Sequence, residues 1–291
     1  MYETFYGLRE KPFSLLPDPA FLYLGKKHRT ALTMLEYGLM NRASITVISG
    51  DVGSGKTTLI RQLLNQLDED TSVGLITNTH QSFGELLQWV ALAFDLPHKD
   101  LDKVTLYRQF VDFLIKQYGI ARRTVLIVDE AQNMSPCTLE ELRLLSNVNA
   151  DKDQVLQLIL VGQPELRQAL RRPDLRQFVQ RVGVAYHLAS LEDEETDAYI
   201  RHRLEVAEGN PEIFEPKAMR FIHHQTCGVP RLINVICDTA LVYGFAEQKR
   251  IITADIVLEV IKDRQRTGFS FSGQEPSSRL GSDVTSARNG K

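Results

Sequence analysis

The sequence has few cysteines and no long apolar run. Three cysteines occur among 291 residues, and none belongs to a Cys-x-x-Cys pair, which excludes a disulfide scaffold and suits a reducing cytoplasm. No apolar stretch approaches the roughly 18 residues of a membrane-spanning helix, and the N-terminus lacks the basic and then apolar order of a signal peptide. We therefore expect a cytoplasmic protein whose membrane role, if it has one, is peripheral and goes through a partner.

An excess of positive charge is also missing. The formal net charge is -3, with 43% hydrophobic and 24% charged residues, which are ordinary values for a globular protein. The whole chain is therefore not a dedicated nucleic-acid coat protein, although a local basic patch could still bind DNA. Its length is sufficient for two domains, or for one large domain with a satellite.

The hydrophobic pattern changes along the chain and divides it into four parts. Short β-branched runs alternate with amphipathic helical stretches up to about residue 190, which predicts an α/β fold with a parallel sheet covered on both faces. Strands are expected at 44–49, 73–77, 123–128, 156–161 and 184–188. Later segments are helical only, and helices are expected at 193–207, 215–226, 230–245 and 253–264. The expected parts are an N-terminal arm with the first helix (1–42), an α/β nucleotide-binding domain (43–190), a small all-helical lid domain (191–265) and a disordered tail (266–291).

A glycine-rich stretch, GDVGSGKT, lies between the first predicted strand and a predicted helix. It fits the P-loop pattern G-x-x-x-x-G-K-[ST], in which glycines let backbone N–H groups approach phosphates and the helix N-terminus adds positive potential. We expect Lys56 to reach the β- and γ-phosphates of ATP and the Thr57 hydroxyl to ligate Mg²⁺. The predicted nucleotide-binding residues are Gly50, Asp51, Val52, Gly53, Ser54, Gly55, Lys56, Thr57 and Thr58.

Two carboxylates follow the apolar strand in TVLIVDEAQ. The strand should deliver Asp129 to the carboxyl edge of the sheet, where ligands of such folds bind. Asp129 is expected to hold the magnesium ion with Thr57, and Glu130 to orient and polarise the attacking water. Together with the glycine-rich stretch, this pair indicates nucleotide hydrolysis.

Gln163, at the end of LILVGQ, has two interpretations. Its amide could face the γ-phosphate or the lytic water, or it could cap the helix that begins at Pro164. Five arginines then occur within 15 residues, a pattern typical of a solvated helix face. Arg181 precedes the last predicted strand, where an arginine could enter a neighbouring subunit's site and neutralise transition-state charge. The arm's aromatic side chains should anchor it, with one or two flanking an adenine; they are Phe5, Tyr6, Phe13, Phe21 and Tyr23.

The stretch GVPRLIN completes a set of motifs that resembles the AAA+ ATPases. The resemblance implies that Gly228 and Pro230 set a turn and that Arg231, as the sensor-2 arginine, closes the lid over the γ-phosphate. It also implies that Gln163 occupies the sensor-1 position, although that position is more often Asn, Ser or Thr. The arginine finger maps best to Arg181, with Arg176 as the second choice. A homo-oligomer, a ring or a filament, is then expected.

The opening MYETFYGLREKPFSLLPDPAFLYL is similar to one branch, the ExeA-like proteins, also called general secretion pathway protein A. The similarity continues through VLIVDEAQNMSPCTLEELRLLSN and GVPRLINVICDTAL, over roughly residues 1–262. It implies an ATPase that drives assembly of a secretion, pilus or polysaccharide-export apparatus through an inner-membrane partner. The alternative is a duplex-DNA-binding ATPase of the transposon target-selection type. The arginines at 167–181 with Lys26, Lys27 and Arg29 favour this alternative, whereas the acidic net charge opposes it.

Overall fold

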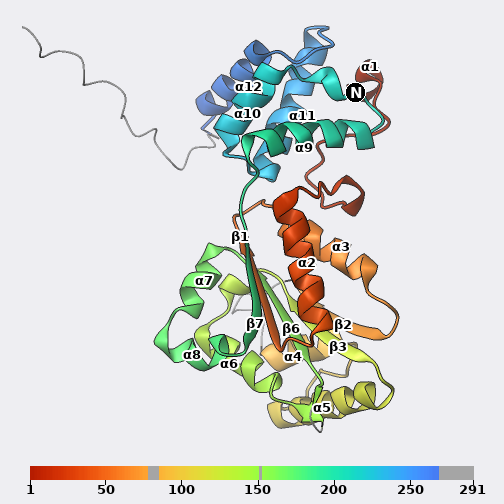
Figure 1. Ribbon diagram of the computed structural model, residues 1–291, viewed down its shortest axis with the longest axis vertical. Coiled ribbons are helices and arrows are strands. Elements are labelled where there is room, and N and C mark those ends of the chain that lie inside the picture. The colour runs from red at the N-terminus through yellow and green to blue at the C-terminus, as the bar shows by residue number, and fades with distance from the viewer. Residues whose placement is uncertain (78–84, 151–152, 269–291) are drawn as a thin grey trace, which may run out of the picture.

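Five parallel strands form the main sheet of this computed structural model, which describes residues 1–77, 85–150 and 153–268 (Figure 1). The sheet order is β2-β3-β6-β1-β7. Most residues of β1, β3 and β6 are buried on both faces, as the apolar runs predicted. All five predicted strands are confirmed, with ends that differ by at most two residues. They are β1 (Ile45–Gly50), β2 (Thr71–Ile76), β3 (Arg123–Val128), β6 (Gln157–Gly162) and β7 (Val182–Leu188).

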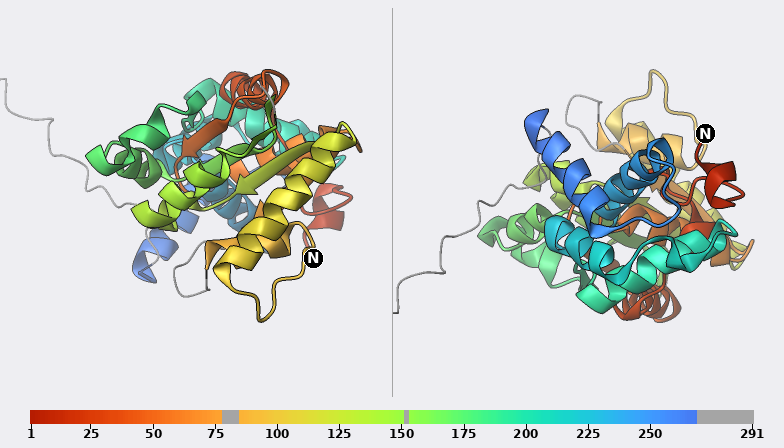
Figure 2. Two further views of the ribbon diagram at one scale, coloured as in Figure 1. Left: turned by 90° about the horizontal axis from the view of Figure 1, so that it is seen from below. Right: turned by 90° about the horizontal axis from the view of Figure 1, so that it is seen from above.

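Helices cover both faces of this sheet, and together they form the sheet lobe (Figure 2). Alternate strand residues separate the two apolar cores: Ile48 and Ile127 face α2 and α3, whereas Val47 and Leu126 face the helices on the other side. One face carries α2 (Lys26–Met40) and α3 (Lys56–Gln66). The other carries α4 (Leu86–Ala93), α5 (Lys103–Gly119), α6 (Pro136–Leu145), α7 (Pro164–Leu170) and α8 (Arg176–Val179).

The remaining helices form a separate helical lobe above the carboxyl edge of the sheet (Figure 1). Proline at the first position begins α10 and α11, and a reciprocal capping box of Glu192 and Glu195 begins α9. The predicted all-helical region is confirmed, and its helix ends differ by at most two residues from prediction. The elements are α9 (Asp193–Val206), η5 (Pro211–Ile213), α10 (Pro216–Thr226), α11 (Pro230–Ala246) and α12 (Ala254–Arg266).

Residues 1–25, hereafter the arm, pack with the helical lobe. The arm contains α1 (Glu3–Tyr6) and η1 (Pro19–Phe21). Its buried side chains join the apolar core of α9 to α12, and the Tyr2 hydroxyl donates to the Asp238 carboxylate. Because α2 packs on the sheet, the segment predicted as one part over 1–42 is shared between two cores. The side chains that dock the arm are Tyr2, Tyr6, Leu8, Phe13 and Phe21.

Several short elements have no counterpart in the sequence prediction. Two-residue strands β4 (Asn149–Ala150) and β5 (Asp153–Gln154) pair in antiparallel fashion, and two-residue strands are too short to show a hydrophobic period. Single 3₁₀ turns, η3 (Ala131–Asn133) and η4 (Pro173–Leu175), follow β3 and α7. Most of the tail predicted at 266–291 lies outside the described residues. Among the described helices, none is long and apolar enough to cross a membrane.

Candidate functional site

The glycine-rich stretch forms a loop between β1 and α3, here called the phosphate loop (residues 50–57). Gly55 precedes α3 with φ of 97°, a conformation that other residues rarely adopt. Gly53 meets the first turn of α11, because a β-carbon there would lie 2.5 Å from Cβ of Arg231. The loop thus leads directly into the N-terminus of α3, where unpaired N–H groups favour an anionic ligand.

Lys56 lies inside the phosphate loop. Its Nζ donates to the carbonyl oxygens of Gly50, at 2.7 Å, and Asp51, at 2.9 Å. Burial lowers the pKa of Lys56, and the nearby carboxylates of Glu130 and Asp129 oppose that shift. This buried ammonium donates to neutral carbonyls, so phosphate oxygens, which carry charge, would be stronger partners.

Thr57 and Asp129 form the pair predicted for the metal. The Thr57 hydroxyl donates to Oδ2 of Asp129 at 3.1 Å, and the other carboxylate oxygen accepts the N–H of Glu130 at 2.9 Å. Only 6% of Asp129 is exposed, and burial raises the pKa of its carboxyl group. A dication would compensate this buried negative charge, and both oxygens are ligands that Mg²⁺ prefers. The donor set therefore fits a magnesium ion.

Glu130 is held by two glutamine amides. Its Oε2 accepts from Nε2 of Gln163 at 3.0 Å and from Nε2 of Gln132 at 2.5 Å. The Gln163 side chain does not cap α7, so the capping interpretation is wrong. Gln132 was missed by the sequence reasoning, although its amide side chain two residues beyond Glu130 was a visible signal.

Arg231 lies where the GVPR turn meets the phosphate loop. Its backbone N–H donates to the Gly53 carbonyl at 3.2 Å, and its exposed side chain lines the pocket beside that loop. The turn is fixed by Gly228, whose φ is 71° and whose carbonyl accepts the N–H of Leu191 at 3.0 Å. The start of the helical lobe, the GVPR turn and the phosphate loop are therefore in direct contact.

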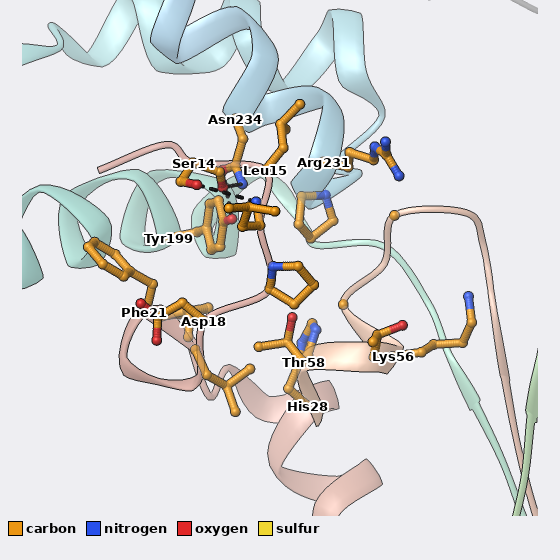
Figure 3. A pocket seen from close by; sticks show the side chains of 18 of the residues that line it. Ser14, Leu15, Asp18, Phe21, His28, Lys56, Thr58, Tyr199, Arg231 and Asn234 are labelled. Atoms are coloured by element: carbon orange, nitrogen blue, oxygen red, sulfur yellow. Dashed lines mark hydrogen bonds between the residues drawn. The ribbon is translucent and has the colours of Figure 1, made fainter. Parts of the chain in front are cut away.

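The arm closes the same pocket from the side opposite Lys56 (Figure 3). The phosphate loop, Thr58, His28, Glu130 and Gln163 line one part, and the arm with α9 and α11 lines the rest. Phe5, Tyr6 and Phe13 pack with the helical lobe, and Phe21 and Tyr23 both pack with it and line the pocket. That one or two of these aromatic residues flank an adenine stays a prediction. The lining residues of the arm are Ser14, Leu15, Leu16, Pro17, Asp18, Phe21, Leu22 and Tyr23.

A buried arginine on α9, Arg203, fastens the arm to the helical lobe. Its guanidinium donates to the carbonyl of Pro12 at 2.5 Å and to the Tyr199 hydroxyl at 2.8 Å. It also lies 4.9 Å from the ring centre of Phe21. The Tyr199 hydroxyl in turn donates to Oδ1 of Asn234 on α11 at 2.8 Å. No local sequence pattern indicated this network, because Pro12, Phe21 and Asn234 are far in the chain from Tyr199 and Arg203.

The predicted finger arginines lie away from this pocket. Arg181 precedes β7, whose other end at Leu188 pairs with Gly50 of the phosphate loop. Arg181 therefore belongs to the opposite end of an edge strand, and the exposed Arg176 belongs to the adjacent α8. Neither is among the described residues that line the chain's own pocket.

The basic residues proposed for DNA are partly engaged elsewhere. Lys27 donates to the Ser190 carbonyl at 2.8 Å and lies 3.0 Å from the Glu192 carboxylate. Arg172 pairs with Asp174 at 2.9 Å. These contacts reduce the positive charge available to a phosphate backbone.

Comparisons with known proteins agree with this arrangement. Residues 39–170 match a family described as an AAA domain. "General secretion pathway protein A" of Aeromonas hydrophila is 44% identical over 260 residues, which cover 89% of this chain and 48% of the relative. The chain thus spans about half the length of that relative.

Solved structures support the fold. Aeropyrum pernix ORC2, in ADPNP and ADP complexes, has a TM-score of 0.65 and 17% identity over 87% of this chain and 71% of its own. Cdc6p of Pyrobaculum aerophilum also has a TM-score of 0.65, with 16% identity over 85% of this chain and 71% of its own. The RuvB Holliday junction branch migration motor of Thermotoga maritima has a TM-score of 0.53, with 17% identity over 82% of this chain and 69% of its own. With its parallel five-stranded P-loop core and C-terminal helical region, this chain is an AAA+ protein and an ExeA-like homologue of general secretion pathway protein A.

Proposed function

We propose that the chain hydrolyses ATP in the pocket between its sheet and helical lobes. One observation carries the proposal: Lys56, Thr57, Asp129, Glu130 and Gln163 meet at the carboxyl edge of the sheet. Their side chains come from three loops that follow neighbouring strands β1, β3 and β6, so the fold itself assembles them. All of these residues except Asp129 line one pocket, which Arg231 also lines.

Each side chain has a distinct chemical task in this proposal. Lys56 and the N–H groups at the start of α3 bind the phosphates, and Arg231 contacts the γ-phosphate from the helical lobe. Glu130 orients the attacking water and accepts its proton, while Gln163 faces the same water or the γ-phosphate. Thr57 and Asp129 would hold Mg²⁺, which when bound neutralises phosphate charge.

A neighbouring copy of the chain is proposed to complete the site. Arg181 lies at the end of β7 remote from the chain's own phosphate loop, so it can stabilise transition-state charge only in another subunit. Arg176 is the second candidate. The proposal implies a ring or filament whose specific activity rises with protein concentration.

Two substitutions test the proposed chemistry. Glu130→Gln should bind ATP but turn it over far more slowly, whereas Lys56→Ala should lose binding because it lacks the phosphate contact. Glu194→Gln, at an exposed position in the first turn of α9, is the matched control and should behave like the unmodified chain. ATP binding and phosphate release are measured separately. Normal turnover by Glu130→Gln would contradict the role given to Glu130.

The process served is proposed to be assembly of a cell-envelope apparatus for secretion, pilus formation or polysaccharide export. Its support is the relative named general secretion pathway protein A, together with the resemblance of the arm. In this proposal the chain works in the cytoplasm and reaches the inner membrane through a protein partner. ATP-loaded Glu130→Gln should float with vesicles that contain that apparatus and remain unbound to vesicles that lack it.

The alternative, a transposon-type DNA-binding ATPase, is tested with the same variant. Binding of ATP-loaded Glu130→Gln to duplex DNA is measured across a salt series, with the ADP-loaded chain as control. Affinity that falls steeply with salt in the ATP state only would favour this alternative, since the slope counts the phosphate contacts. Absence of binding at low salt would exclude it.

A further inference from the structure

Glu130 belongs to a closed ring of three hydrogen bonds with Gln132 and Gln163. Both glutamine Nε2 atoms donate to Oε2 of Glu130, and the backbone N–H of Gln163 donates to Oε1 of Gln132 at 3.0 Å. Gln163 lines the pocket, whereas Gln132 is not among the described lining residues. Gln132 therefore contacts Glu130 without lining the pocket.

The backbone N–H of Gln163 fixes which way the Gln132 amide points. An N–H can only donate, so the group that faces it must be the amide oxygen of Gln132. The NH₂ group at the other end of the amide then faces the Glu130 carboxylate. Both ends of one side chain are thus used, and the amide has a single favourable orientation.

The local backbone is shaped to admit this amide. Glu130 itself adopts a left-handed conformation, with φ of 53°, and thereby starts η3, which carries Gln132. At the end of β6, a β-carbon on Gly162 would lie 3.0 Å from Oε1 of Gln132 and 2.8 Å from Leu166. A glycine at this position lets the amide lie against the β6 backbone.

We propose that Gln132 is a positioning residue for ATP hydrolysis, which holds the Glu130 carboxylate in place while Gln163 is free to exchange partners. The inference rests on the proposed function. Gln163 lies in the pocket, so its side chain can leave Glu130 for a phosphate oxygen or a water. The donor from Gln132 then keeps the carboxylate oriented. The Gln132 amide thus keeps its hydrogen bond to Glu130, whereas the Gln163 amide can exchange that bond for another partner.

Gln132→Met tests this division of roles, because methionine has a similar length and no amide. We expect kcat to fall about 10- to 100-fold, as for loss of one hydrogen bond to a charged acceptor, with ATP affinity unchanged. Asn133→Met, at the exposed neighbouring position in η3, is the matched control and should keep normal kcat and affinity. Thermal melting of both variants establishes that they fold.

A double substitution distinguishes positioning from general stabilisation. If Gln132 acts through Glu130, adding Gln132→Met to Glu130→Gln should not lower kcat further. Gln132→Glu provides a second variant, since it keeps an oxygen for the Gln163 N–H but replaces the donor with a repelling carboxylate. It should also lower kcat at unchanged ATP affinity.

Three results would overturn the inference. Normal kcat in Gln132→Met or Gln132→Glu would show that the donor is dispensable. If Gln132→Met lowered kcat by the same factor in Glu130→Gln as in the unmodified chain, Gln132 would act elsewhere than through Glu130. In both cases slow turnover by Glu130→Gln alone would leave the proposed function standing. Normal turnover by Glu130→Gln would instead overturn the proposed function and this inference with it.

Discussion

Replacing Gly228 with alanine should destabilise the chain by about 2–5 kcal/mol. The backbone at Gly228 has φ of 71°, which costs an alanine about 1–2 kcal/mol. The new β-carbon would also lie 1.9 Å from the carbonyl oxygen of Leu191, far inside van der Waals contact. Because the obstacle is backbone, the GVPR turn must shift, which adds about 1–3 kcal/mol.

Gly7→Ala provides the matched control. Gly7 has the same φ of 71°, but nothing lies within 4 Å of a β-carbon built there. Its substitution should therefore cost about 1–2 kcal/mol, the backbone contribution alone. The two free energies of unfolding are measured in urea by far-ultraviolet circular dichroism. Gly228→Ala should also weaken ATP binding, since the displaced turn carries Arg231. Equal destabilisation by the two substitutions would refute the reasoning.

Three further predictions concern separate parts of the chain. Burial lowers the pKa of His28, so below about pH 6.5 the unfolded chain binds a proton that the folded chain excludes. The free energy of unfolding should therefore fall as the solution is acidified. It should fall less steeply in the variant His28→Gln than in the control variant His224→Gln. The variants Arg181→Ala and Lys56→Ala should each be inactive alone, but a mixture of the two should regain ATPase activity. Mixed oligomers without activity would argue against the proposal that Arg181 acts in the site of a neighbouring subunit. Arg203→Met should lower the free energy of unfolding by about 3 kcal/mol and speed hydrogen exchange in arm residues 13–16. Unchanged hydrogen exchange would contradict the role of Arg203 in holding the arm against the helical lobe.

The sheet and the phosphate loop were predictable because their signals are local. A buried parallel strand needs a continuous apolar run, and the loop needs glycines at fixed spacing, so residues within ten positions of one another carry the information. Asp129 and Glu130 followed because a parallel sheet places strand ends at one edge. The position of Gln163 left two interpretations open, an amide that caps α7 or one that faces the γ-phosphate or the lytic water, and its contact with Glu130 was not predicted.

Features built from distant residues could not be predicted in the same way. Arg203 occurs in an ordinary amphipathic helix, and no residue near it in the sequence indicates that Pro12 and Phe21 are its partners. Lys27 appeared available for DNA until the structure showed its contacts with Ser190 and Glu192. In each case the partner is more than 150 residues away in the chain, where sequence periodicity carries no information.

Docking of the arm onto the helical lobe has a consequence for how the chain folds during synthesis. Tyr2 contacts Asp238 across 236 positions, so the arm completes a core whose other members are synthesised much later. The strands and helices of the sheet lobe are complete by Leu188 and can assemble before α9 has been translated. Until α11 follows, the aromatic side chains of the arm have no native core to enter. Docking of the arm must therefore wait for the helical lobe, and such non-local contacts form slowly.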